Sequence, residues 1–102
     1  MSQREYPIDI PADAIADFCR RNRIRKLSLF GSILRDDFGP ESDIDVLVEF
    51  KEDTTPGLAY FSMQDELSEM LGRPVDLVTP KGLSKYVRND VIASADEVYA
   101  AA

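Results

Sequence analysis

The pattern of apolar and polar positions predicts three short strands in this chain. Residues 43–50 alternate most regularly, and one face of the segment is made of Ile44, Val46, Val48 and Phe50. Period-two alternation with β-branched residues is typical of a strand that has one face in a core. Short apolar runs at 26–30 and 75–78 predict two further strands, because each run is bounded by glycine, proline or polar residues.

Helical spacing predicts the segments between these strands. A helix is expected over about 11–22, where three apolar residues recur on one helix face: Ile15, Phe18 and Cys19. A second helix, 58–71, is expected to end at Gly72, since glycine favours the left-handed conformation that commonly follows a helix. A brief helix over 32–36 and a final helix over about 87–100 complete the predicted order α-β-α-β-α-β-α.

This order favours an α/β (α+β) fold, a small mixed β-sheet flanked by helices. The chain has 102 residues, and a chain of this size buries roughly two-thirds of its unfolded surface around a single core. We therefore expect one domain that spans residues 1–102.

Composition and charge exclude several classes of protein. The chain is 44% hydrophobic and 30% charged, as in ordinary globular proteins. No apolar run approaches the roughly 20 residues of a membrane span, and residues 1–5 lack the apolar core of a signal peptide. A lone Cys19 permits no internal disulfide, which favours the cytoplasm. The net charge of −7 argues against direct nucleic-acid binding, which needs a basic face.

Carboxylates on the second and third predicted strands are candidate metal ligands. Asp43 and Asp45 are two residues apart, so they project from one strand face roughly 6.6 Å apart. Carboxylates suit Mg²⁺, which completes its coordination shell with water and substrate phosphates. If the two strands pair, Asp76 lies beside these acids as a third ligand or as a general base; otherwise it is an exposed acid on an edge strand.

A Gly-Ser step after the first strand is a candidate phosphate-binding turn. Gly31 has no Cβ, so the backbone can turn sharply and a phosphate can approach closely. Ser32 would begin a short helix whose N–H groups and dipole favour an anion. Arg35 lies three residues later, and either a triphosphate or a neighbouring acid could be its partner. With an Asp-x-Asp sequence ten residues on, the step predicts a joint phosphate and metal site.

The combined pattern resembles the minimal nucleotidyltransferases of the DNA polymerase β superfamily. It consists of Gly31-Ser32, the segment 42–45 that enters an apolar strand, and the segment 75–78. The resemblance implies a polymerase β-like palm with two Mg²⁺ ions and a nucleoside triphosphate, usually ATP, as the substrate. The Gly-Ser step would hold the phosphates, and the three acids would bind metal. Two Mg²⁺ ions roughly 4 Å apart would clamp the attacking and leaving oxygens.

Many proteins of this kind are antitoxins encoded beside a small helical toxin, an RNase of the HEPN class. The resemblance implies that this chain transfers AMP from Mg-ATP to a hydroxyl of its toxin, usually a tyrosine, and silences it. Catalysis of this type consists mainly of positioning and charge neutralisation. A domain this small has an open cleft, which a partner would complete.

Two other interpretations compete with this one. The chain could neutralise a toxin by binding alone, through its acidic surface and apolar side chains of the predicted helix 58–71. Asp-x-Asp also occurs in phosphatases of the haloacid dehalogenase type. There the strand precedes the aspartates, whereas here the strand follows Asp43 and Asp45.

Overall fold

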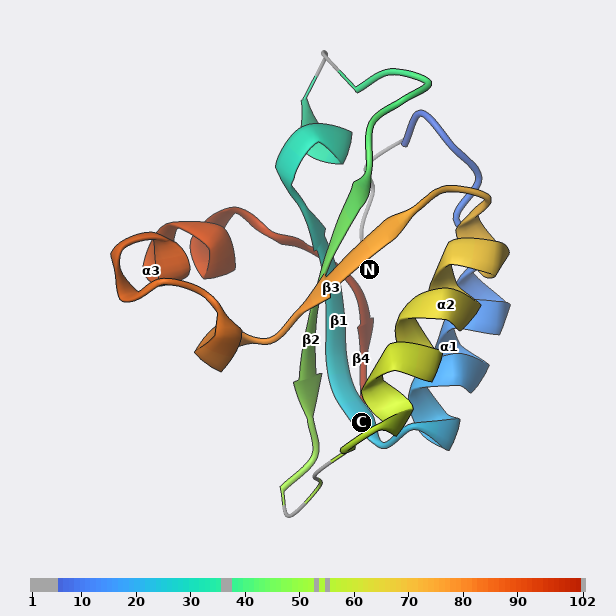
Figure 1. The fold of residues 1–102 in the computed structure, drawn as a ribbon, viewed down its shortest axis with the longest axis vertical. Helices are drawn as coiled ribbons and strands as arrows, with labels where there is room; N and C mark the ends of the chain where they lie inside the picture. The colour runs from blue at the N-terminus through green and yellow to red at the C-terminus, as the bar shows by residue number, and fades with distance from the viewer. Residues whose placement is uncertain (1–5, 36–37, 53, 55, 102) are drawn as a thin grey trace.

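The computed structural model describes residues 6–35, 38–52, 54 and 56–101, which form an α+β fold around a four-stranded mixed sheet (Figure 1). The strand order is β3-β2-β1-β4. β1 is antiparallel to both β2 and β4, whereas β2 and β3 are parallel. The strands are β1 Ile24–Phe30, β2 Ile44–Phe50, β3 Val75–Val78 and β4 Asp96–Ala100. The expected mixed sheet is therefore confirmed.

Helices α1 and α2 cover one face of the sheet, and α3 stands on the other side (Figure 1). Their bounds are α1 Ala12–Arg21, α2 Ala59–Leu71 and α3 Lys85–Ser94. α2 stops before Gly72, as predicted, and Gly72 has a left-handed φ of +71°. Two short 3₁₀ helices, η1 Gly31–Leu34 and η2 Pro80–Gly82, follow β1 and β3. Within the described segments, no helix is both long and apolar enough to cross a membrane.

The hydrophobic core lies between the sheet and helices α1 and α2. Each helix contributes three buried side chains: Ile15, Phe18 and Cys19 from α1, and Met63, Leu67 and Leu71 from α2. They pack against the predicted apolar face of β2, where Ile44, Val46 and Val48 are fully buried. Burial raises the pKa of the Cys19 thiol to about 12, so this cysteine is an inert core residue.

The predicted final helix over 87–100 is wrong in its second half. α3 ends at Ser94, and β4 then pairs with β1, with Leu27 aligned to Tyr99. Alanine, which is frequent at this end of the chain, favours a helix by intrinsic propensity. Pairing with β1 prevails, because the β-branched Val98 and aromatic Tyr99 pack partly buried against the core. The order therefore ends in a strand, and the described sheet has four strands instead of three.

Side chains of α2 satisfy the outer edge of β3. The Val75 N–H donates to Ser68 Oγ at 3.1 Å, and the Leu77 N–H donates to Gln64 Oε1 at 3.1 Å. The Tyr60 hydroxyl donates to the Leu77 carbonyl. An edge strand with free N–H and C=O groups can pair with other chains, so these bonds both fix β3 against α2 and protect its edge.

Replacing Gln64 with leucine is expected to lower the free energy of unfolding by about 1 kcal/mol, because the partly buried Leu77 N–H loses its acceptor. Urea unfolding followed by circular dichroism would measure the change. Glu69→Leu is the matched control, since Glu69 is exposed on the same helix. Equal stabilities of the two variants would contradict this role of Gln64.

Candidate active site

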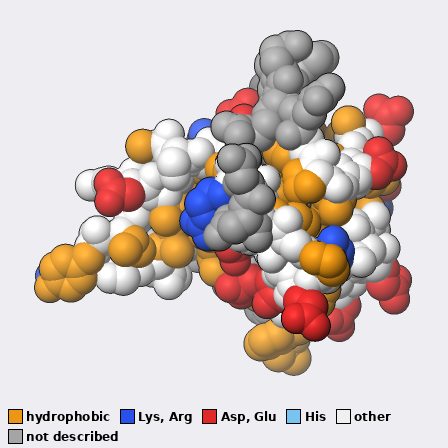
Figure 2. Space-filling model, turned by 90° about the horizontal axis from the view of Figure 1, so that it is seen from above, with side chains coloured by type: hydrophobic (Ala, Val, Ile, Leu, Met, Phe, Trp, Pro, Cys, Tyr) orange, Lys and Arg blue, Asp and Glu red, His pale blue; other side chains and the backbone are white. Residues whose placement is uncertain are grey.

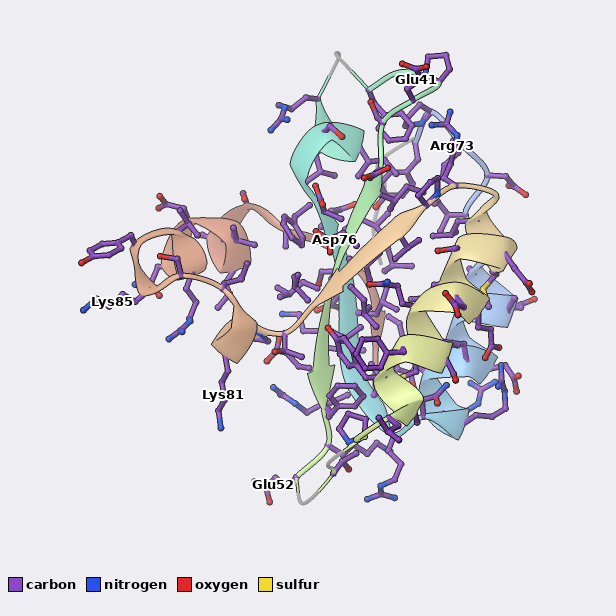
Figure 3. The ribbon with its side chains drawn as sticks, in the orientation of Figure 1. Glu41, Glu52, Arg73, Asp76, Lys81 and Lys85 are labelled. Atoms are coloured by element: carbon purple, nitrogen blue, oxygen red, sulfur yellow. The ribbon has the colours of Figure 1, made fainter. Side chains whose placement is uncertain are left out.

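The register of β2 and β3 brings two of the predicted acids side by side. Asp45 is aligned with Asp76 in the parallel pair, and aligned residues of neighbouring strands project from the same sheet face. Their chain neighbours Ile44, Val46 and Leu77 are buried in the core, so both acids lie on the face opposite α1 and α2. Asp45 is half-buried, and Asp76, which is labelled in Figure 3, is exposed.

Asp43 lies at the entrance to the same strand. It is exposed and immediately precedes β2, two residues before Asp45. Its backbone carbonyl accepts a hydrogen bond from Ser32 Oγ at 3.5 Å. The Gly-Ser turn therefore lies directly beside the Asp-x-Asp sequence.

The backbone of Gly31 lies so close to Asp45 that no residue with a Cβ would fit at this position. Its φ is +76°, and a Cβ added there would lie 2.1 Å from Asp45 Oδ2. Such a distance is impossible without displacing the carboxylate. The glycine thus serves two purposes, since it adopts a left-handed backbone and leaves room for Asp45.

The helix that follows the turn is shorter than predicted. η1 is a 3₁₀ helix of four residues, Gly31–Leu34, whereas the prediction spanned 32–36; Asp36 lies outside the described residues. So short a helix has a small dipole. Arg35 follows it in extended conformation and is not on a helix face shared with Ser32. The Arg35 charge still acts on the Asp45 carboxyl: burial and two neighbouring acids raise its pKa, and Arg35 opposes part of that rise.

Negative charge is concentrated on this face of the sheet. The pKa of Asp45 is raised above its ordinary value of 3.8, first by burial, then by repulsion from Asp76 and Asp43, with Arg35 opposing. Burial, and then the charge of Asp76, raise the pKa of Tyr60, whose hydroxyl donates to the Leu77 carbonyl on β3. Hence the site holds an excess of negative charge that a cation would relieve.

The donor chemistry of the site fits Mg²⁺. In the part of the chain that the structure describes, no three acidic, cysteine or histidine side chains form a ready group that could hold a metal ion. Mg²⁺ does not require one, because it is usually held by one or two carboxylates together with water and substrate phosphates. Asp45 and Asp76, aligned on neighbouring strands, supply two carboxylates of this kind, and Asp43 lies two residues before Asp45.

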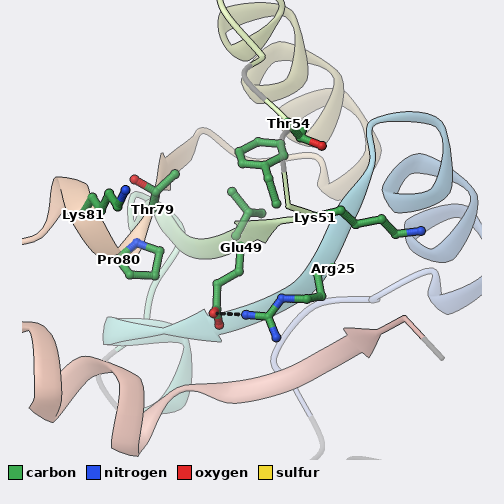
Figure 4. Close-up of a pocket in the computed structure, with 9 residues that line it drawn as sticks. Arg25, Glu49, Lys51, Thr54, Thr79, Pro80 and Lys81 are labelled. Carbon is green, nitrogen blue, oxygen red and sulfur yellow. Dashed lines mark hydrogen bonds and ion pairs between the residues drawn. The ribbon is translucent and has the colours of Figure 1, made fainter.

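A separate pocket lies at the other end of β2 (Figure 4). It has a volume of about 400 Å³, and its lining includes Arg25, Glu49, Lys51, Thr79 and Lys81. Arg25 is paired with Glu49 at 2.6 Å, which neutralises part of the positive charge there. None of the six predicted site residues lines this pocket.

Nearly the whole chain is similar to known proteins. Residues 12–97 match the family model described as a nucleotidyltransferase domain. A Methanocaldococcus jannaschii relative, provisionally named a protein adenylyltransferase, is 41% identical over 71 residues, which are 68% of this chain and 70% of the relative. A solved structure provisionally described as a minimal nucleotidyltransferase is 32% identical with a TM-score of 0.69, and the match covers 82% of this chain and 85% of that one.

Two solved toxin–antitoxin complexes contain a chain of the same fold. One was solved with AMP-PNP; its TM-score is 0.72 at 24% identity, with 90% of this chain and 75% of that chain covered. The other contains a tri-AMPylated Shewanella oneidensis HEPN toxin with an MNT antitoxin; its TM-score is 0.63 at 25% identity, with 88% and 70% covered.

Proposed function

The chain belongs to the nucleotidyltransferase domain family, and from this premise we propose that it is a protein adenylyltransferase that transfers AMP from ATP to a hydroxyl of a HEPN-type toxin and thereby neutralises the toxin. Its relatives are named protein adenylyltransferases, and a structural neighbour is a complex of an MNT antitoxin with an AMPylated HEPN toxin. The acceptor is a tyrosine in this proposal.

One observation carries the proposal: Asp45 is in register with Asp76 and in contact range of the Gly31 turn. A nucleotidyl transfer site needs carboxylates for a divalent metal and a turn that admits phosphate, and it needs both within reach of one triphosphate. These features lie on one open face of the sheet.

The proposed roles follow from the chemistry of each side chain. Gly31, Ser32 and Arg35 bind the triphosphate, and Asp43, Asp45 and Asp76 hold Mg²⁺. Mg²⁺, when bound, supplies positive charge that neutralises the phosphate oxygens. The toxin hydroxyl attacks the α-phosphorus, so an O–P bond forms while the bond to the β-phosphate oxygen breaks and pyrophosphate leaves. Asp76, the exposed acid on β3, accepts the hydroxyl proton.

The direct test is transfer to the protein encoded beside this chain. The two purified proteins are incubated with Mg-ATP, and both are weighed by mass spectrometry. The expected result is one or more AMP units on the partner. Unmodified partner under these conditions, with the toxin still inhibited, would overturn the transferase proposal.

Asp76→Asn is expected to abolish this transfer and leave the fold intact, because Asp76 is exposed and makes no contribution to the core. The amide retains the size of the side chain but cannot accept the proton. Mass spectrometry of the partner and a thermal melt of the variant would measure the two effects. A wild-type rate in this variant would remove Asp76 from the mechanism.

Neutralisation by binding alone is the second candidate, and exposed apolar side chains favour it. At the start of α2, Leu58 is 85% exposed and Phe61 is 66% exposed. On α3, Tyr86 is 84% exposed, and hydrophobic side chains lie on the surface there (Figure 2). Further along α2, the apolar side chains of Met63, Leu67 and Leu71 are buried in the core, so the exposed apolar contact surface of the predicted helix 58–71 lies at its start. Inhibition of the toxin by an Asp43→Asn, Asp45→Asn double variant, without AMP transfer, would support this candidate.

A further inference from the structure

Arg73 links the start of β3 to the loop that precedes β2. It lies between α2 and β3, and its Nη1 donates to the carbonyl oxygens of Gly39 at 2.9 Å and Ser42 at 3.3 Å. Its guanidinium carbon lies 5.0 Å from the ring centroid of Phe38, a cation–π distance. Figure 3 shows Arg73 next to the loop that carries Glu41.

The loop held by Arg73 is a closed turn. The Ser42 N–H donates to the Gly39 carbonyl at 3.0 Å, and the Gly39 N–H donates to Ser42 Oγ at 2.9 Å. Because Arg73 contacts the carbonyls of both residues, one guanidinium spans the two ends of the turn. Both bonds come from the same nitrogen, Nη1, so the ammonium group of a lysine could replace part of this contact.

The residue after this turn is Asp43, the only one of the three site acids that lies outside a strand. On its N-terminal side, the Ser42 carbonyl is bound by Arg73. On its C-terminal side, the Ile44 N–H donates to the Pro74 carbonyl at 2.9 Å. Two consecutive residues, 73 and 74, therefore hold the backbone on both sides of Asp43 and connect it to the strand of Asp76.

We propose that Arg73 is a positioning residue that fixes Asp43 relative to Asp45 and Asp76 and thereby sets the affinity of the acidic site for a divalent cation. The inference rests on the metal-binding role proposed above for these acids. A residue that orients a metal ligand from outside the coordination shell typically changes metal affinity or activity about 10- to 100-fold.

Binding of Mn²⁺ alone, followed by electron paramagnetic resonance, tests the inference without any need for activity. Arg73→Met is expected to raise the Mn²⁺ dissociation constant by about tenfold or more, and Arg73→Lys is expected to recover part of the loss. Arg20→Met is the matched control, because Arg20 is exposed on α1 and the same charge is removed. An equal change in Arg20→Met and Arg73→Met would overturn the inference.

Amide hydrogen exchange supplies the second readout. In Arg73→Met, the Ser42 and Ile44 amides are expected to exchange faster than in the wild type, since their turn loses its anchor. Faster exchange with unchanged Mn²⁺ affinity would reduce Arg73 to a structural anchor and overturn the inference, as would no change in either. If Arg73→Met fails to fold, the same two measurements, Mn²⁺ affinity and amide exchange, are made on Arg73→Lys, and the same results support or overturn the inference.

The two proposals fail in distinguishable ways. Weaker Mn²⁺ binding in the Arg73 variants, with no AMP transfer by the wild-type protein, would leave Arg73 as a positioning residue of a cation site and refute the transferase. AMP transfer by the wild type, with Mn²⁺ affinity unchanged in both variants, would refute the role of Arg73 alone.

Discussion

Asp45→Asn is expected to raise the melting temperature of the protein at pH 7 while it lowers the rate of AMP transfer about 10²- to 10³-fold. Burial and the charges of Asp76 and Asp43 raise the pKa of the Asp45 carboxyl, so the folded protein holds this ionised group at a cost that a neutral amide avoids. The same group is a proposed metal ligand. Loss of one group that stabilises charge in the transition state commonly lowers the rate by about 10²- to 10³-fold.

The stability gain should depend on pH in a defined direction. Because the pKa of Asp45 is higher in the folded state than its ordinary value of 3.8, the folded protein binds the proton more tightly than the unfolded chain does. Below pH 3.8 the carboxyl is protonated in both states, and wild type and variant should differ little. The difference should grow as the pH rises from 3.8 to the raised pKa of the folded state, and it should stay constant above that pKa.

Thermal melts from pH 3 to pH 8, with and without Mg²⁺ and AMP-PNP, would measure the difference in melting temperature between the wild type and Asp45→Asn. The additives should stabilise the wild-type protein more than the variant, since a bound cation offsets the repulsion only where the carboxylate is present. Asp65→Asn is the control, because Asp65 is exposed on α2. A variant that melts no higher than the wild type at pH 7 would show that Asp45 carries no electrostatic penalty.

The local patterns were sufficient to predict most of the fold and the sheet face on which Asp45 lies. Period-two alternation placed Ile44 in the core and Asp45 on the opposite face, and both assignments are confirmed. The end of α2 at Gly72 was predictable because the left-handed conformation is a property of the glycine itself. Such features depend on a few consecutive residues, so the sequence alone determines them.

Features that depend on contacts between segments far apart in the sequence could not be predicted from local patterns. The proximity of Asp76 to Asp45 required β3 to pair with β2, which the sequence allowed but did not require. β4 was mistaken for helix because its pairing with β1 outweighs the local propensity of an alanine-rich segment. Arg73 was missed because its acceptors are backbone carbonyls some 30 residues away, and a backbone carbonyl has no sequence signature.

Gly31→Ala should cost both stability and transfer activity. Its left-handed φ of +76° imposes a strain of about 1–2 kcal/mol on any residue with a Cβ. The new Cβ would lie 2.1 Å from Asp45 Oδ2, so the carboxylate or the turn must move. A misplacement of about 1 Å in a catalytic group can lower the rate about 10²-fold, and we expect a loss of that size.

Gly72→Ala separates these two effects. Gly72 has a φ of +71°, but a Cβ there would meet nothing within 4 Å, so this variant should lose similar stability and retain transfer. In Gly31→Ala, the displaced Asp45 carboxyl should also become more hydrated, and its pKa should fall toward the ordinary value of 3.8. Carbon-13 NMR titration of the carboxyl would follow that fall. The two alanine variants could instead transfer AMP at equal rates, with the Asp45 pKa still raised in both. That result would mean that AMP transfer does not require the close contact between Gly31 and Asp45.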